Sequence, residues 1–124
     1  MLDTGGDVRI YLATEPVDMR KSFSGLAGAV GQALGKEPQS GSLFVFLNRR
    51  RTLLKVLSWD TNGFCLLCKR LSAGVFLVPD GSAGKNHVEV TAAALSKLVK
   101  ARHVQLQASR LSFRDGKIVF PKHE

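Results

Sequence analysis

The sequence predicts a small single domain of the α+β class, in which a βαβ start leads into an antiparallel meander, a second helix and a C-terminal β-hairpin. Three apolar runs follow one another between residues 43 and 71 with only short polar turns between them, which is typical of a meander. A strand pattern and an apolar helical stripe precede them. The length of 124 residues suits one domain, which we place at residues 8–124 behind a flexible lead-in at 1–7.

The βαβ start occupies the first third of the chain. Apolar residues alternate with other residues at 8–13, which predicts a strand, and a turn follows. Asp18 is expected to cap a helix, because its carboxylate can accept a bond from a free amide of the first turn. Apolar residues at helical spacing between 23 and 34 form one face, and Gly35 is placed to end the helix. The first two strands should therefore run parallel and end at the same edge of the sheet.

The meander fills residues 43–71. Residues 48–51, Asn-Arg-Arg-Arg, separate its first two apolar runs, and residues 60–63, Asp-Thr-Asn-Gly, separate the second from the third. Asn-Gly is strong turn chemistry, since both residues accept positive φ at low cost. Strands joined by such short connections run antiparallel.

This topology predicts that cations distant in sequence share one end of the sheet. Arg20 and Lys21 should join them from the first turn of the helix, whose free amides favour anions. Lys55 should lie nearby. Clustered cations are typical of nucleic-acid binding, whereas single cations are usually solvated loop charges or residues that protect a sheet edge. The predicted basic rim comprises Arg20, Lys21, Arg49, Arg50, Arg51, Lys69 and Arg70.

The remainder of the chain contains further strand and helix signals. Residues 75–78 are expected to form a strand and 79–85 a loop. Thr91 is placed to cap a helix over residues 92–101. Apolar alternation on both sides of Asp115-Gly116 predicts a terminal hairpin. The segment 80–124 is thus a helix followed by a hairpin.

Composition restricts the partners and the compartment. The formal net charge is +8, from 18 basic and 10 acidic residues, which favours a phosphate-rich or acidic partner. No apolar run is long enough to span a membrane, and the first residues lack the pattern of a secretory signal, so we expect a cytoplasmic protein. Cys65 and Cys68 fall in a predicted strand, where positions three apart face opposite sides. Ordinary strand cysteines are therefore favoured over a metal or redox pair.

The acidic residues do not predict a catalytic site. Asp18 is assigned as a cap, and Asp60 and Asp115 as turn residues. Asp18 and Asp60 should lie at opposite ends of the sheet, which argues against a shared metal. We therefore predict no catalytic residue, no metal and no cofactor. Trp59 ends an apolar strand and is interpreted as a core residue, with base stacking as the alternative.

Several motifs carry a family resemblance. They are Pro-Val-Asp-Met-Arg-Lys at 16–21, the Phe-Asn-Arg-type segment at 46–51, Trp59-Asp60 and Gly63-Phe64. In this order and spacing the chain resembles, over residues 8–79, the accessory protein commonly called TnpB of the sixty-six family of bacterial insertion sequences. The resemblance implies a protein that assists transposition beside a separate, larger transposase, and it implies no catalytic residue.

The chain departs from the family pattern in two places. Leu47 stands where the family commonly has arginine, and the family usually has aromatic residues near Ser58 and Cys68, where this chain has Ser58, Leu67 and Cys68. This copy therefore has a thinner aromatic surface around Trp59. If such aromatics stack on bases or on a partner, binding here should be weaker.

Two functional hypotheses follow, and a third is weaker. The first is a noncatalytic accessory protein of insertion-sequence transposition that contacts DNA phosphates through the basic rim. The alternative is a protein-interaction module that docks on the transposase of the same element without contacting DNA. A nuclease or strand-transfer enzyme is the third class. The sequence leaves open the oligomeric state and any preference for particular DNA ends.

Overall fold

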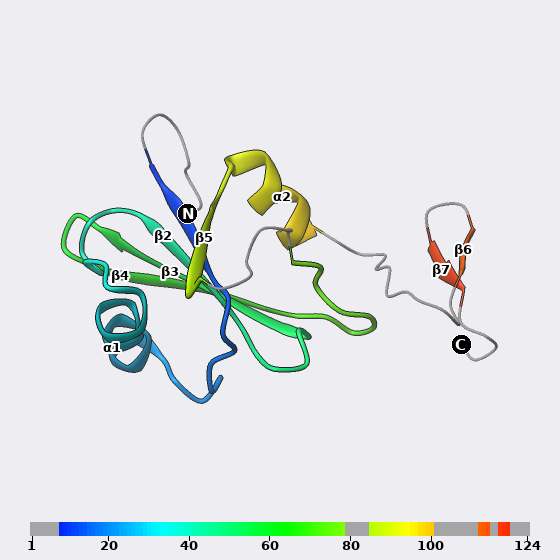
Figure 1. Cartoon of the computed structure of the whole chain (residues 1–124), viewed down its shortest axis with the longest axis horizontal. Helices are drawn as coiled ribbons and strands as arrows, with labels where there is room; N and C mark the ends of the chain where they lie inside the picture. Colours follow the sequence, from blue (N-terminus) through cyan, green and yellow to red (C-terminus); the bar gives the residue numbers. More distant parts are fainter. Residues whose placement is uncertain (1–7, 79–84, 101–111, 115–116, 120–124) are drawn as a thin grey trace.

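A computed structural model describes residues 8–78, 85–100, 112–114 and 117–119 (Figure 1). It contains a five-stranded mixed sheet, two helices and a separate two-stranded sheet. The predicted α+β class is confirmed. The elements in chain order are β1 (Ile10–Ala13), α1 (Phe23–Leu34), β2 (Leu43–Leu47), β3 (Leu53–Asp60), β4 (Gly63–Arg70), β5 (His87–Val90), α2 (Ala92–Lys100), β6 (Ser112–Arg114) and β7 (Lys117–Val119).

The strand order of the main sheet is β4-β3-β2-β1-β5. β1 runs parallel to β2, with Leu12 opposite Val45, and α1 connects the two strands. β2, β3 and β4 pair antiparallel with their sequence neighbours. The predicted βαβ start and meander are therefore confirmed. β5 pairs antiparallel with the other side of β1 and was not predicted.

The two helices cover opposite faces of the sheet (Figure 1). On one face, Leu26 and Val30 of α1 pack in a cluster with Phe44 and Phe46 of β2. On the other face, α2 contributes Leu95 and Leu98 to a second cluster that includes strand residues and the segment after β4. All five residues of β2 are buried. Successive side chains of a strand point to opposite faces, and here both faces are covered, so the strand is apolar throughout.

The start of α1 differs from the prediction. The helix begins at Phe23, so Arg20 and Lys21 precede it and do not lie in its first turn. Asp18 is not its cap, because its carboxylate instead accepts bonds from the Arg20 backbone and guanidinium in a separate turn. The predicted end is confirmed, since Gly35 has a φ of 66° in the left-handed region that glycine adopts readily.

Two further predictions about single elements have different outcomes. Residues 75–78 do not form the predicted strand, although Phe76 is fully buried and its amide donates to the Arg51 carbonyl at 2.7 Å. The segment packs beneath the sheet by its side chains without joining a strand ladder. The cap of α2 is confirmed, because the Ala94 amide donates to the Thr91 hydroxyl at 3.0 Å.

The ends of the chain are described only in part. β6 and β7 pair antiparallel, as predicted for the terminal hairpin. Its Asp115-Gly116 turn, the lead-in at 1–7 and most of the loop at 79–85 lie outside the described residues. Among the residues that the structure describes, no helix has the length and apolar character needed to cross a membrane.

Candidate functional site

Sheet register gathers predicted cations at one end of the molecule. Leu47 lies opposite Leu54, and Leu53 lies opposite Arg70, so the β2–β3 connection and the end of β4 share this end. The loop after β1 joins them, because the Val17 amide donates to the Leu47 carbonyl at 3.0 Å. The cations themselves, however, have different surroundings, and these decide what each can bind.

The connection between β2 and β3 is fixed by the side chain of Asn48. Its Oδ1 accepts hydrogen bonds from the amides of Thr52 at 2.8 Å and Leu53 at 3.0 Å, and its Nδ2 donates to the Thr52 hydroxyl at 3.1 Å. The Arg51 amide also donates to the Asn48 carbonyl at 3.0 Å. We call residues 48–51 the arginine turn. Its backbone shape does not depend on the guanidinium groups, which make no hydrogen bond or ion pair within the described part of the chain.

All three arginines of this turn are exposed. Arg51 has a φ of 60°, a left-handed conformation uncommon for a residue with a side chain. The Arg51 carbonyl accepts the bond from Phe76, so this backbone conformation is tied to the buried segment after β4. Arg70, at the end of β4, is also exposed.

Arg20 is already paired within the protein. Its Nη2 lies 2.6 Å from Asp18 Oδ2, and its Nε lies 3.0 Å from both carboxylate oxygens. The side-chain bond from Arg20, followed by the bond from its backbone amide, holds the pKa of the Asp18 carboxyl well below its ordinary range. The same contacts raise the pKa of Arg20. Exposed ion pairs of this kind are weak. Pairing with Asp18 therefore lowers the ability of Arg20 to bind another anion but does not remove it.

Two lysines at this end donate to backbone carbonyls. Lys55 Nζ lies 2.9 Å from the Met19 oxygen and 2.7 Å from the Lys21 oxygen, which ties the loop before α1 to β3. Lys69 Nζ donates to the Val99 carbonyl in the last turn of α2. These ammonium groups stabilise loop and helix contacts. Lys21 itself is exposed.

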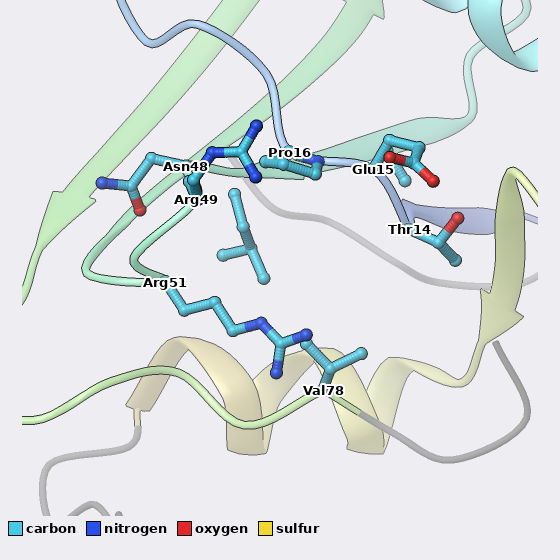
Figure 2. Close-up of a pocket in the computed structure, with 9 residues that line it drawn as sticks. Thr14, Glu15, Pro16, Asn48, Arg49, Arg51 and Val78 are labelled. Atoms are coloured by element: carbon cyan, nitrogen blue, oxygen red, sulfur yellow. The ribbon is translucent and has the colours of Figure 1, made fainter. Parts of the chain in front are cut away.

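A pocket of about 200 Å³ opens beside the arginine turn, at the carboxyl ends of the parallel strands β1 and β2. Figure 2 shows Arg49 reaching toward Pro16 and Arg51 toward Val78 on different sides of this space. Glu15 also lines the pocket, so its wall is mixed in charge. Crevices beyond the carboxyl ends of parallel strands are frequent ligand sites in α/β sheets.

Trp59 lies at the other end of β3, away from the arginine turn. It is half-buried, and its ring packs edge-on against Phe64 with centroids 4.9 Å apart and planes at 76°. Trp59 is therefore not one of the fully buried core residues. It packs against Phe64 at the margin of the core. Base stacking by Trp59 stays a prediction.

The acidic and sulfur-containing residues are dispersed. Asp18 and Asp60 lie at opposite ends of the sheet, as predicted. Cys65 lies opposite Ser58 and Cys68 opposite Lys55, on opposite faces of β4. Within the described part of the chain, no group of three or more His, Cys, Asp or Glu residues is placed to hold a metal ion.

Sequence reasoning missed the structural role of Asn48. An asparagine that directly follows an apolar strand and precedes a polar turn is a recognisable signal, since its side chain can bond amides a few residues further on. The carbonyl contacts of Lys55 and Lys69 had no such local signal, because the partners of Lys55 lie 36 and 34 residues away in the chain and that of Lys69 lies 30 residues away.

Comparisons with known proteins support the resemblance. Residues 8–109 match the family described as IS66 Orf2 like protein, so the match extends well beyond the residue 79 reached by the motifs. The chain is 41% identical over 108 residues to the uncharacterized protein y4hO of Sinorhizobium fredii, covering 85% of this chain and 92% of the relative. It is 38% identical over 88 residues to y4jC of the same organism, covering 71% and 75%. No solved structure matches. The chain therefore belongs to the IS66 Orf2 like family, which points to an accessory role in an insertion sequence.

Proposed function

We propose that this protein is a noncatalytic accessory protein of insertion-sequence transposition and that it binds DNA phosphates through the arginine turn. The observation that carries the proposal is the arginine turn itself, in which Asn48 fixes the backbone while three arginines stay exposed. Family membership supplies the transposition context. The net charge of +8 adds a general attraction to polyanions.

A fixed backbone whose guanidinium groups make no hydrogen bond or ion pair with the other described residues suits phosphate binding for two reasons. Ordering the turn on binding costs little entropy, because the Asn48 bonds already hold it. Each guanidinium offers paired donors that match a phosphate, and each phosphate neutralised releases condensed counterions. The pocket lined by Arg49 and Arg51, of about 200 Å³, is large enough for one phosphate group, whereas the Glu15 carboxylate in the same wall disfavours an anion beside it.

Within the basic rim, the proposed contacts are not of equal strength. Arg49, Arg50 and Arg51 are the principal contacts, and Lys21 and Arg70 extend them at the same end of the sheet. The remaining members contribute less, because Arg20 is paired with Asp18 and Lys69 donates to Val99. These contacts position DNA and carry no base information by themselves.

The test is the affinity for duplex DNA as a function of salt, measured by fluorescence anisotropy. Arg50→Gln should weaken binding and reduce the slope of log affinity against log salt by about 0.9, the value for one phosphate on B-DNA. Arg9→Gln is the control for net charge, since it removes the same charge from an exposed arginine before β1 that pairs with Glu89, at the opposite end of the sheet. The double variant Arg49→Gln/Arg50→Gln should lose about twice as much slope. Equal losses for Arg50→Gln and Arg9→Gln would show that net charge alone drives binding.

A second candidate function is docking on an acidic surface of the element's transposase. The supporting observation is that Leu77 is 52% exposed next to Val78 of the pocket wall, which adds an apolar contact to the cationic one. Under this alternative, Leu77→Ser should abolish capture of the purified transposase while leaving DNA affinity unchanged. Under the DNA proposal, Arg50→Gln weakens DNA binding whether or not the transposase is present.

A further inference from the structure

The two edges of the main sheet differ greatly. β5 forms one edge over four residues, and β4 forms the other over eight. Among the described residues, β4 has one strand neighbour, β3, and Figure 1 shows it as the outermost strand on its side. An unpaired edge of this length presents a row of amide and carbonyl groups that can pair with another strand.

The register shows which groups of β4 face outward. The Leu71 amide donates to the Thr52 carbonyl at 2.9 Å, so the backbone amide and carbonyl of Leu71 point toward the β3 side. In an antiparallel pair, alternate residues bond toward the partner, and those between them point their amide and carbonyl groups away. The outward set is therefore Phe64, Leu66, Cys68 and Arg70.

The side chains of β4 do not protect this edge. Native sheets usually block long edges with proline, a bulge or a charge in the middle of the strand. Here residues 64–67 are apolar or cysteine and only half-buried, and Cys68 is exposed. The charges stand at the two ends instead, with Lys69 and Arg70 at one end and Asp60 beside Gly63 at the other.

We propose that β4 pairs antiparallel with β4 of a second copy of this chain, with Leu66 opposite the partner's Leu66. A two-fold axis perpendicular to the sheet keeps each face on its own side, so residues that face each other must have the same parity. Leu66 is the outward residue nearest the middle of the strand, and this register places Phe64 opposite the partner's Cys68. It joins the two five-stranded sheets into one.

Charge favours this direction of pairing. The antiparallel arrangement sets the Lys69-Arg70 end of one copy beside the partner's Asp60–Gly63 turn, so that opposite charges meet at both ends of the interface. A parallel arrangement would bring the two cationic ends together. Like charges directly opposite each other destabilise a strand pair, so a second copy in antiparallel orientation is the occupant that fits this edge.

The pairing has a consequence for the arginine turns. β4 runs in opposite directions in the two copies, so the two turns would lie at opposite ends of the joined sheet. This part of the inference rests on the proposed function: such a dimer could hold two DNA segments, one at each end. Self-association is measured without DNA, so it can fail or succeed independently of DNA binding.

The test compares two substitutions at Cys68 by sedimentation velocity over a wide concentration range in reducing buffer. Cys68→Pro removes an outward amide from an exposed edge position, where proline is tolerated by the monomer. Cys68→Ala keeps that amide and is the matched control. The unmodified chain and Cys68→Ala should dimerise as concentration rises, while Cys68→Pro should stay monomeric. A monomeric unmodified chain, or equal dimerisation of Cys68→Pro, overturns the proposal.

Hydrogen exchange on the unmodified chain gives a second readout that needs no variant. The amides of Phe64, Leu66, Cys68 and Arg70 should exchange fast in dilute solution and slow down as concentration rises. The amides of Cys65 and Leu67, which bond toward β3, should change little. Outward amides that are unprotected at every concentration contradict the pairing of two copies.

Discussion

The two turns of the meander form the most instructive comparison in this molecule. The turn at the Asp60 end is the shorter, since Asp60 and Gly63 are already paired and only Thr61 and Asn62 lie between them. The arginine end needs residues 48–52 to connect β2 to β3. Its conformation depends on the side chain of Asn48, which bonds the backbone at two places. A two-residue turn is enough to reverse the chain between two strands of this sheet. The β2–β3 connection is longer, is held by the Asn48 side chain, and carries three arginines that the reversal itself does not need.

The same comparison separates two classes of cation. At the arginine end, Lys55 and Lys69 donate to backbone carbonyls, whereas Arg49, Arg50 and Arg51 extend from a turn held by other groups. Position at one end of the sheet therefore does not by itself indicate function. A cation is more available for a ligand when the protein does not already use its donors.

The largest expected effect is the difference in stability between asparagine-to-alanine variants in the two turns. Asn48→Ala removes two bonds to backbone amides and one to Thr52, and should lower the free energy of unfolding by about 2–3 kcal/mol. Asn62→Ala, at an exposed position of the short turn, should cost less than about 0.5 kcal/mol. Urea denaturation measures both. Asn48→Ala should also weaken DNA binding although it changes no charge, and unchanged affinity would show that the turn's shape is irrelevant.

Trp59 offers a test of the other end of β3. Trp59→Ala removes a half-buried ring from Phe64 and should lower the free energy of unfolding by about 2 kcal/mol, less than for a fully buried aromatic residue. Affinity for single-stranded and duplex DNA should stay the same if the ring only packs. A stacking role would instead reduce affinity by about 1–3 kcal/mol for the base concerned. Anisotropy titrations at one salt concentration distinguish the two outcomes.

Lys55 should behave as a structural residue despite its charge. Lys55→Met keeps the apolar stem but leaves the Met19 and Lys21 carbonyls without their donor, and should cost about 1.5 kcal/mol of unfolding free energy. Lys97→Met, on the exposed side of α2, is the charge-matched control and should be nearly neutral. Thermal and urea unfolding provide the measurement. Equal stability of the two variants would mean that Lys55 is not needed to hold the loop before α1.

Sequence patterns predicted the fold wherever local chemistry and period agreed. The fully apolar run of β2, the turn before β4 and the glycine that ends α1 are all present as expected. Positive φ in the turn before β4 occurs at Thr61, however, and not at the Asn-Gly pair. Phe76 was misplaced in a strand because an apolar residue can be buried without joining a ladder.

The candidate site was predictable only in part. Register follows from the order of strands and turns, so the gathering of arginines at one end could be inferred from the sequence. The partners of individual cations could not. Val99, which accepts from Lys69, lies on a helix that reaches this end only through the tertiary fold. Asp18 could be expected to cap a helix, but Arg20 competes for its carboxylate.

That competition supplies the smallest and most specific prediction. Asp18→Asn keeps an oxygen that can accept the Arg20 amide but removes the charge that pairs with the guanidinium. Arg20 should then be available to DNA, with a modest gain in affinity and an increase in the salt slope of up to about 0.9. The gain is measured by anisotropy against the unmodified chain.

The pH dependence of this gain has a definite sign. The folded-state pKa of the Asp18 carboxyl lies below its ordinary value of 3.8, so the carboxylate stays charged from neutral pH down past that value. Its contribution to stability is therefore complete above the ordinary pKa and is lost only as the pH falls through the lower, folded-state pKa. Asp18→Asn should accordingly keep its advantage in DNA binding at every pH from 7 to about 4. An advantage that disappears near pH 5 would indicate that the carboxyl is being protonated there, and hence that Arg20 does not hold it in solution.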